Sequence, residues 1–153
     1  LTFYKPLMNY FYYALVISLF VGVIVCDQWS DCSAGKGRIT NINCNVGPLP
    51  IHVGGNVTVK CTGALSEQIT SGTLTFNAKL LTGGTWIPLP QITSPICGEG
   101  ITCPYPAGTA NFLFTLQVPP ITPAGEYKGI INVVDQNKAM LACIDFDYTL
   151  HAM

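Results

Sequence analysis

The sequence predicts an all-β fold: an Ig-like β-sandwich of about seven antiparallel strands in two sheets. After residue 27, apolar and polar residues alternate in short runs, and no apolar repeat of helical spacing appears. Turns rich in glycine and proline separate these runs. The 153 residues are 49% hydrophobic and only 10% charged, which is enough apolar material for the core of one domain and excludes a disordered chain.

The first 26 residues form a segment of their own. Leu7 to Cys26 is almost continuously apolar or aromatic and follows Lys5, as in a secretory signal. We therefore expect a cleaved signal peptide over residues 1–26 and one domain over residues 27–153. The alternative is a single-pass anchor, because about 20 apolar residues can span a bilayer. Asp27 follows the segment at once, without a basic cluster, which favours cleavage.

The first two expected strands, 38–46 and 56–62, form a hairpin. Gly and Pro residues between them supply the turn. A hairpin centred on His52 and Val53 places Cys44 opposite Cys61, and on this argument we pair these two cysteines.

Two strands are expected in the middle of the chain. Residues 73–81 alternate well, and residues 86–89 make a shorter strand that ends at a proline. The side chains expected to point inward from the longer strand are Leu74, Phe76, Ala78 and Leu80.

The last three strands are expected over residues 111–118, 127–134 and 140–150. A proline-rich connection around Ile121 separates the first from the second, and a polar turn joins the second to the third. Apolar residues alternate along the first strand (Phe112, Phe114, Leu116 and Val118) and along the third (Ile144, Phe146, Tyr148 and Leu150).

Six cysteines follow the signal: Cys32, Cys44, Cys61, Cys97, Cys103 and Cys143. An even number in an oxidising compartment predicts three disulfides, and spacing alone leaves 15 connectivities open. A zinc site needs paired short spacings, and only Cys97 and Cys103 are closely spaced, so we expect no metal.

Residues Trp29 to Leu150 resemble the ML (lipid-recognition) domain family. The family includes the Niemann-Pick type C cholesterol carrier and the fungal phosphatidylglycerol/phosphatidylinositol transfer proteins. The resemblance rests on the order and spacing of several motifs. These are Asp31-Cys32-Ser33 followed by Gly37, the loop from Cys97 to Cys103-Pro104, Pro123-Ala124-Gly125-Glu126-Tyr127, and Ala142-Cys143-Ile144-Asp145-Phe146.

The resemblance implies the disulfides Cys32–Cys143 and Cys97–Cys103, and two splayed sheets with an apolar cavity between them. The ligand would be a sterol or a phospholipid, carried between membranes by a monomer in transient contact with the membrane surface. The residues expected to line the cavity are Leu74, Phe76, Ala78, Leu80, Trp86, Leu89, Phe112, Phe114, Leu116, Ile121, Tyr127, Ile131 and Phe146. Alternation alone favours a solid core over a ligand cavity.

The sequence argues against other functions. The net charge of −1 and the lack of a basic patch make nucleic acid an improbable partner. There are two histidines, no Gly-x-Ser-x-Gly and no phosphate-binding glycine loop, so we expect no catalysis and no cofactor. The alternative is a non-catalytic Ig-like interaction module or a lipid-presenting co-receptor. The signal and the cysteines predict a secreted protein or one of the lysosomal or endosomal lumen.

Asn56-Val57-Thr58 is a glycosylation sequon at the start of an expected strand. Val57 is inward by alternation, so Asn56 points outward and is open to glycosylation. Secretion from a eukaryotic host should therefore add a glycan at Asn56, visible as a mass shift that a glycosidase removes. Protein with the same mass before and after the enzyme would contradict this.

Overall fold

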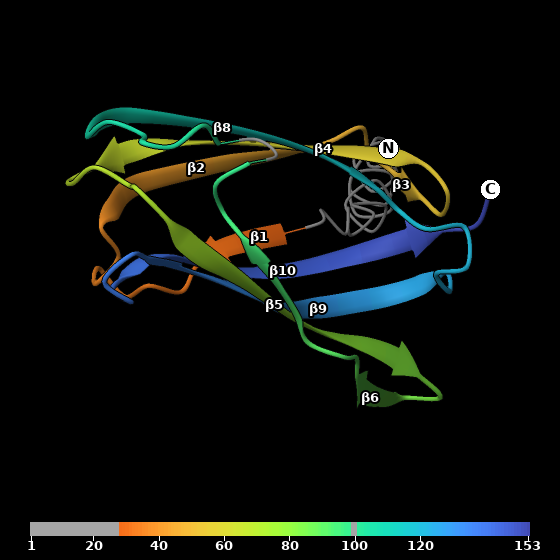
Figure 1. Cartoon of the computed structure of the whole chain (residues 1–153). Coiled ribbons are helices and arrows are strands. Elements are labelled where there is room, and N and C mark those ends of the chain that lie inside the picture. Colours follow the sequence, from red (N-terminus) through yellow and green to blue (C-terminus); the bar gives the residue numbers. More distant parts are fainter. Residues whose placement is uncertain (1–27, 99–100) are drawn as a thin grey trace, which may run out of the picture.

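The computed structural model describes residues 28–98 and 101–153, which form two sheets packed face to face (Figure 1). The expected signal peptide lies outside these residues. The described ranges hold no helix with the length and apolar character needed to cross a membrane. The strands are β1 (Gln28–Asp31), β2 (Ile39–Gly47), β3 (Ile51–His52), β4 (Asn56–Leu65), β5 (Gly72–Thr82), β6 (Thr85–Pro88), β7 (Ile92–Pro95), β8 (Gly108–Gln117), β9 (Gly125–Asp135) and β10 (Met140–His151).

The two sheets differ in size. The larger has the order β1-β10-β9-β5-β6, with β7 also paired to β5 and β3 to β10, and the smaller has the order β2-β4-β8. The pairings are antiparallel except that of β3 with β10, which is parallel. This two-sheet arrangement confirms the predicted sandwich.

All seven predicted strands are present, close to their expected bounds. Sequence reasoning missed β1, β3 and β7, which have only two to four residues. Alternation over so few residues does not distinguish a strand from a loop.

All three expected disulfides are present, Cys32–Cys143, Cys97–Cys103 and Cys44–Cys61. Cys44 lies directly opposite Cys61 in the β2–β4 register, with 4.1 Å between their Cα atoms, which confirms the hairpin argument. Asn56 is exposed at the first residue of β4, next to buried Val57. Its glycosylation stays a prediction.

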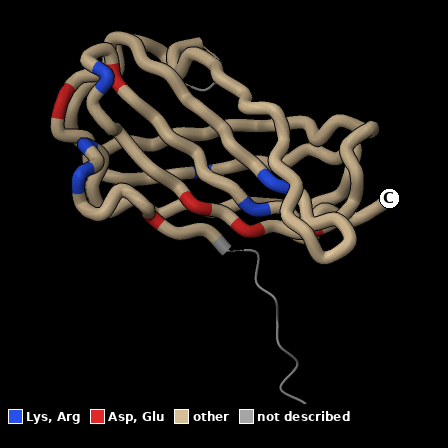
Figure 2. Tube along the Cα trace, turned by 90° about the horizontal axis from the view of Figure 1, so that it is seen from below, with Lys and Arg blue, Asp and Glu red and all other residues tan. Residues whose placement is uncertain are grey.

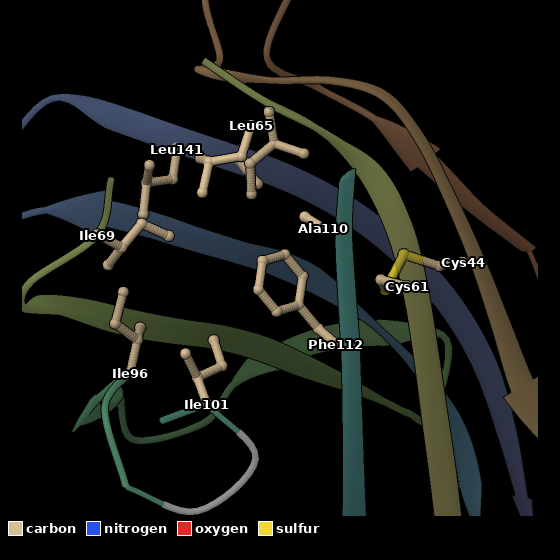
Figure 3. Close-up of a cluster of buried hydrophobic side chains, with 11 residues drawn as sticks. Cys44, Cys61, Leu65, Ile69, Ile96, Ile101, Ala110, Phe112 and Leu141 are labelled. Carbon is tan, nitrogen blue, oxygen red and sulfur yellow. A yellow bond between two sulfur atoms is a disulfide. The ribbon is translucent and has the colours of Figure 1, made fainter. Parts of the chain in front are cut away.

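The main buried cluster fills one end of the sandwich, which we call the closed end (Figure 3). Leu65 and Ala110 from the smaller sheet meet Leu141 from the larger one, and all three are at most 3% exposed. The loop that follows β7 covers this cluster with Ile96 and Ile101 (Figure 3).

Polar contacts also tie the two sheets at the closed end. Arg38, just before β2, forms ion pairs with Glu67 and with Asp135, the last residue of β9. The Asp135 side chain is 2% exposed and accepts hydrogen bonds from the backbone N–H groups of Asn137 and Ala139. The turn between β9 and β10 is thereby joined to the smaller sheet.

Removing a disulfide should destabilise the protein more, the longer the chain segment that the disulfide closes into a loop. Sequence separations of 111, 17 and 6 residues correspond to about 5, 3 and 2 kcal/mol in the chain-entropy model. Paired Cys→Ala variants compared by denaturant unfolding would test this order. A Cys97–Cys103 variant less stable than the Cys32–Cys143 variant would contradict it.

Candidate functional site

The facing sides of the two sheets carry apolar side chains from four strands. The register aligns Phe76 of β5 with Ile131 of β9, and Leu80 with Tyr127. On the smaller sheet Phe112 and Phe114 of β8 lie beside Cys61 and Val59 of β4. Apart from the tyrosine hydroxyl these side chains are apolar, so this face is suited to contact with apolar matter.

Exposure increases along the inner face of β8. Ala110 is fully buried, Phe112 is 7% exposed, Phe114 is partly buried and Leu116 is 57% exposed, although all four share one face of the strand. The sandwich is therefore packed at the closed end and lacks cover over β8 at the other end, which we call the open end.

On the larger sheet, two aromatic rings stack at the start of the open end. The rings of Phe76 and Phe146 lie 5.3 Å apart between centroids, with 7° between their planes. Phe146 pairs in register with Gly129, which pairs with Ala78. A Cβ added to Gly129 would lie 2.9 Å from Cζ of Phe146. The Phe146 ring can therefore lie over position 129 only because glycine has no side chain there. Both rings border the space toward the open end.

Tyr127 is the inner-face residue with a polar end. Its hydroxyl donates a hydrogen bond of 2.7 Å to the carbonyl of Pro123. This bond holds the β8–β9 connection against the first residues of β9. Burial raises the pKa of the Tyr127 phenol above its ordinary value of 10.0.

Two of the residues expected in the cavity, Trp86 and Ile121, lie elsewhere. Trp86 pairs with Leu81, not with inward-facing Leu80, so it lies on the outer face, where Nζ of Lys128 is 3.9 Å from its ring centroid. Ile121 is 92% exposed in the β8–β9 connection. Leu89 follows β6 and donates a backbone hydrogen bond to the carbonyl of inward-facing Ala78, so it continues the inner face at the edge of the larger sheet, where it is 37% exposed.

The remaining expected residues lie on the inner faces: Leu74, Phe76, Ala78, Leu80, Phe112, Phe114, Leu116, Tyr127, Ile131 and Phe146. Whether they contact a ligand stays a prediction. Sequence reasoning missed Trp29, which pairs with Phe146 and packs against the core. Its strand β1 has only four residues, too few for alternation to reveal, and the one signal was a large aromatic residue three positions before Cys32.

A hollow of about 260 Å³ lies along β1 and β10. Its lining combines Ser30, Lys128, Asp145 and Asp147, which face outward, with the inner-face residues Trp29 and Phe146. This hollow of mixed polarity therefore differs from the wholly apolar space expected between the sheets.

Comparison with known proteins identifies a matching family, related sequences and similar structures. The family model described as ML domain matches residues 27–150. A putative phosphatidylglycerol/phosphatidylinositol transfer protein of Dictyostelium discoideum is 33% identical over 86% of this chain and 91% of its own length. A Niemann-Pick type C2 protein from the Japanese carpenter ant has a similar structure, with a TM-score of 0.56, 16% identity, and coverage of 81% of this chain and 99% of that one. Chicken MD-1, solved with lipid IVa, gives a TM-score of 0.57 at 15% identity over 78% and 85% of the two chains.

The buried hydroxyl of Tyr127 gives a testable pH dependence. Tyr127→Phe removes the bond to Pro123 and should cost about 1 kcal/mol at neutral pH. Above about pH 10 the unfolded chain releases the phenol proton while the folded protein keeps it, so wild type loses this contribution as pH rises through the raised pKa. The stability difference between the two proteins, measured by urea unfolding, should shrink there. A difference that is constant with pH would contradict this.

Proposed function

Because the chain belongs to the ML domain family, we propose that it is a non-catalytic lipid carrier. It holds the apolar part of one lipid between its two sheets and transfers that lipid between membranes. The observation that supports this most directly is the rise in exposure along β8, from fully buried Ala110 to Leu116 at 57%. A solid core would bury inward-facing residues at both ends.

Apolar burial alone supplies the affinity that such a carrier needs. Each CH₂ group taken out of water contributes about 0.8 kcal/mol, so an acyl chain binds strongly without charged contacts. The open end offers Phe76, Phe114 and Leu116 as partly exposed partners on the two facing sheets. A ligand there would cover side chains that water now reaches.

The ligand is a phospholipid in this proposal. Several of the relatives are named phosphatidylglycerol/phosphatidylinositol transfer proteins, among them one of Mycosarcoma maydis that is 26% identical over 77% of this chain. A sterol is the alternative, because both ligands need an apolar slot of similar chemistry.

The protein acts as a monomer in an oxidising compartment, either outside the cell or in the lysosomal or endosomal lumen. Three disulfides among the described residues support this, because thiols stay reduced in the cytosol.

Two alanine substitutions separate a ligand space from a solid core. Ala78 and Ala142 are both 5% exposed, but Ala142 belongs to the closed-end cluster and Ala78 does not. Ala142→Phe should overpack the core and destabilise the lipid-free protein by about 1 to 3 kcal/mol. Ala78→Phe should cost less, because its ring can enter the space that the lipid occupies, and it should lower the lipid content.

The measurements are denaturation midpoints of delipidated protein and lipid content by extraction and mass spectrometry. Equal destabilisation by both substitutions, with no lipid in wild type, would favour a plain Ig-like interaction module. Bound lipid without faster transfer between vesicles would favour a protein that presents lipid to a receptor.

A further inference from the structure

Four chain segments without any charged side chain meet at the open end. Residues 47–55, 81–90, 116–125 and 150–153 contain no Asp, Glu, Lys or Arg. In Figure 2 the charged residues gather toward the opposite end and across the outer face of the larger sheet, away from the end that carries the C-terminus. We call these four segments together the apolar tip.

Direct contacts join residues 47–55, 116–125 and 150–153, and a contact of the neighbouring Leu80 brings residues 81–90 next to them. Val118 donates a backbone hydrogen bond to Gly55, and Val53 donates one to His151, both 2.9 Å long. A Cβ on Gly54 would lie 3.4 Å from Cε of Met153 and 4.0 Å from Cγ of Pro120. A Cβ on Gly125 would lie 3.2 Å from Cδ1 of Leu80, which links the β8–β9 connection to the strand leading into residues 81–90.

The apolar tip carries most of the large hydrophobic side chains that the described residues expose. Six of nine lie on it: Leu49, Ile87, Leu89, Leu116, Ile121 and Met153. Ile121 and Met153 are more than 90% exposed. Single exposed apolar residues are ordinary on a soluble domain, but their concentration where charge is absent indicates a binding surface.

We propose that the apolar tip docks on the surface of a lipid bilayer, with Leu49 and Ile121 inserted among the acyl chains. The proposal rests on the carrier function above and names the face that meets the membrane. Leu49, Leu89 and Ile121 belong to three separate loops at this end, so they suit a fluid layer better than a rigid protein partner. The partly exposed inner face of β8 reaches the same end, so a lipid could pass into the bilayer without crossing water.

The absence of basic residues from the tip predicts how it binds. Lysine or arginine near a membrane adds attraction to anionic lipid that salt screens. On the neighbouring outer face, Lys79 and Lys128 lie in one register row with Asp147, so acid and base are mixed there. Docking therefore depends on apolar insertion and needs neither anionic lipid nor low salt.

The test compares two double variants of the mature chain. Leu49→Ser with Ile121→Ser alters the tip, whereas Leu113→Ser with Ile130→Ser removes two exposed aliphatic residues from the outer faces of β8 and β9. Binding is measured by flotation with vesicles of phosphatidylcholine, alone or mixed with phosphatidylglycerol, at low and high salt. All measurements are made at one pH, near neutral.

The tip variant should lose about tenfold or more in vesicle partitioning, because it has lost two inserted aliphatic side chains. The outer-face variant should stay within about twofold of wild type, and salt or phosphatidylglycerol should change wild-type binding little. Equal loss of binding in both variants would overturn the proposal, and so would wild-type binding that requires phosphatidylglycerol. The proposal would also fail if wild type were a dimer in solution and the tip variant alone were a monomer.

Lipid content measured on the same samples separates the two proposals. If wild type carries lipid and the tip variant still floats normally, docking by the tip is wrong and carriage stands. If wild type binds vesicles through the tip but carries no lipid, docking stands and carriage is wrong.

Discussion

The ion pair between Arg38 and the buried carboxylate of Asp135 is the constraint on which the shape of the sandwich depends. Asp135 ends β9 in the larger sheet, while Arg38 leads into β2 of the smaller one. A carboxylate that is 2% exposed would be costly to leave unpaired, so the two sheets cannot separate there without a large penalty. The Cys32–Cys143 disulfide at the same end joins the residue after β1 to β10, within the larger sheet. No such pair or disulfide is found at the open end of the described chain.

This asymmetry explains how similar apolar residues have different surroundings in one sandwich. Phe112 and Phe114 are two residues apart on the same face of β8, yet only the first is buried by the closed-end cluster. Partly exposed apolar surface costs free energy in water, and a protein of marginal stability tolerates it only where the rest is firmly held. The disulfides and the dense closed end therefore stabilise a fold in which the inner face of β8 is less well covered at the other end.

Sequence reasoning found the long strands and their inner faces because alternation over eight or more residues defines both. It paired Cys44 with Cys61 for the same reason, since a hairpin fixes register. It misplaced Trp86 because β6 has four residues, and its face is set by the turn at Gly83 and Gly84, which aligns Trp86 with Leu81. The grouping of the apolar tip was not foreseen, because its four segments meet only through contacts between distant parts of the chain.

The two-residue strand β3 has a consequence for how the two sheets are joined. It connects β2 and β4 of the smaller sheet, yet Ile51 and His52 pair with the end of β10 in the larger one. This pairing acts as a strap across one edge of the open end, and the hydrogen bond from Val53 to His151 extends it. The two sheets are therefore joined by strand pairing along one edge of the open end, whereas β8 at the other edge pairs only with β4 among the described strands.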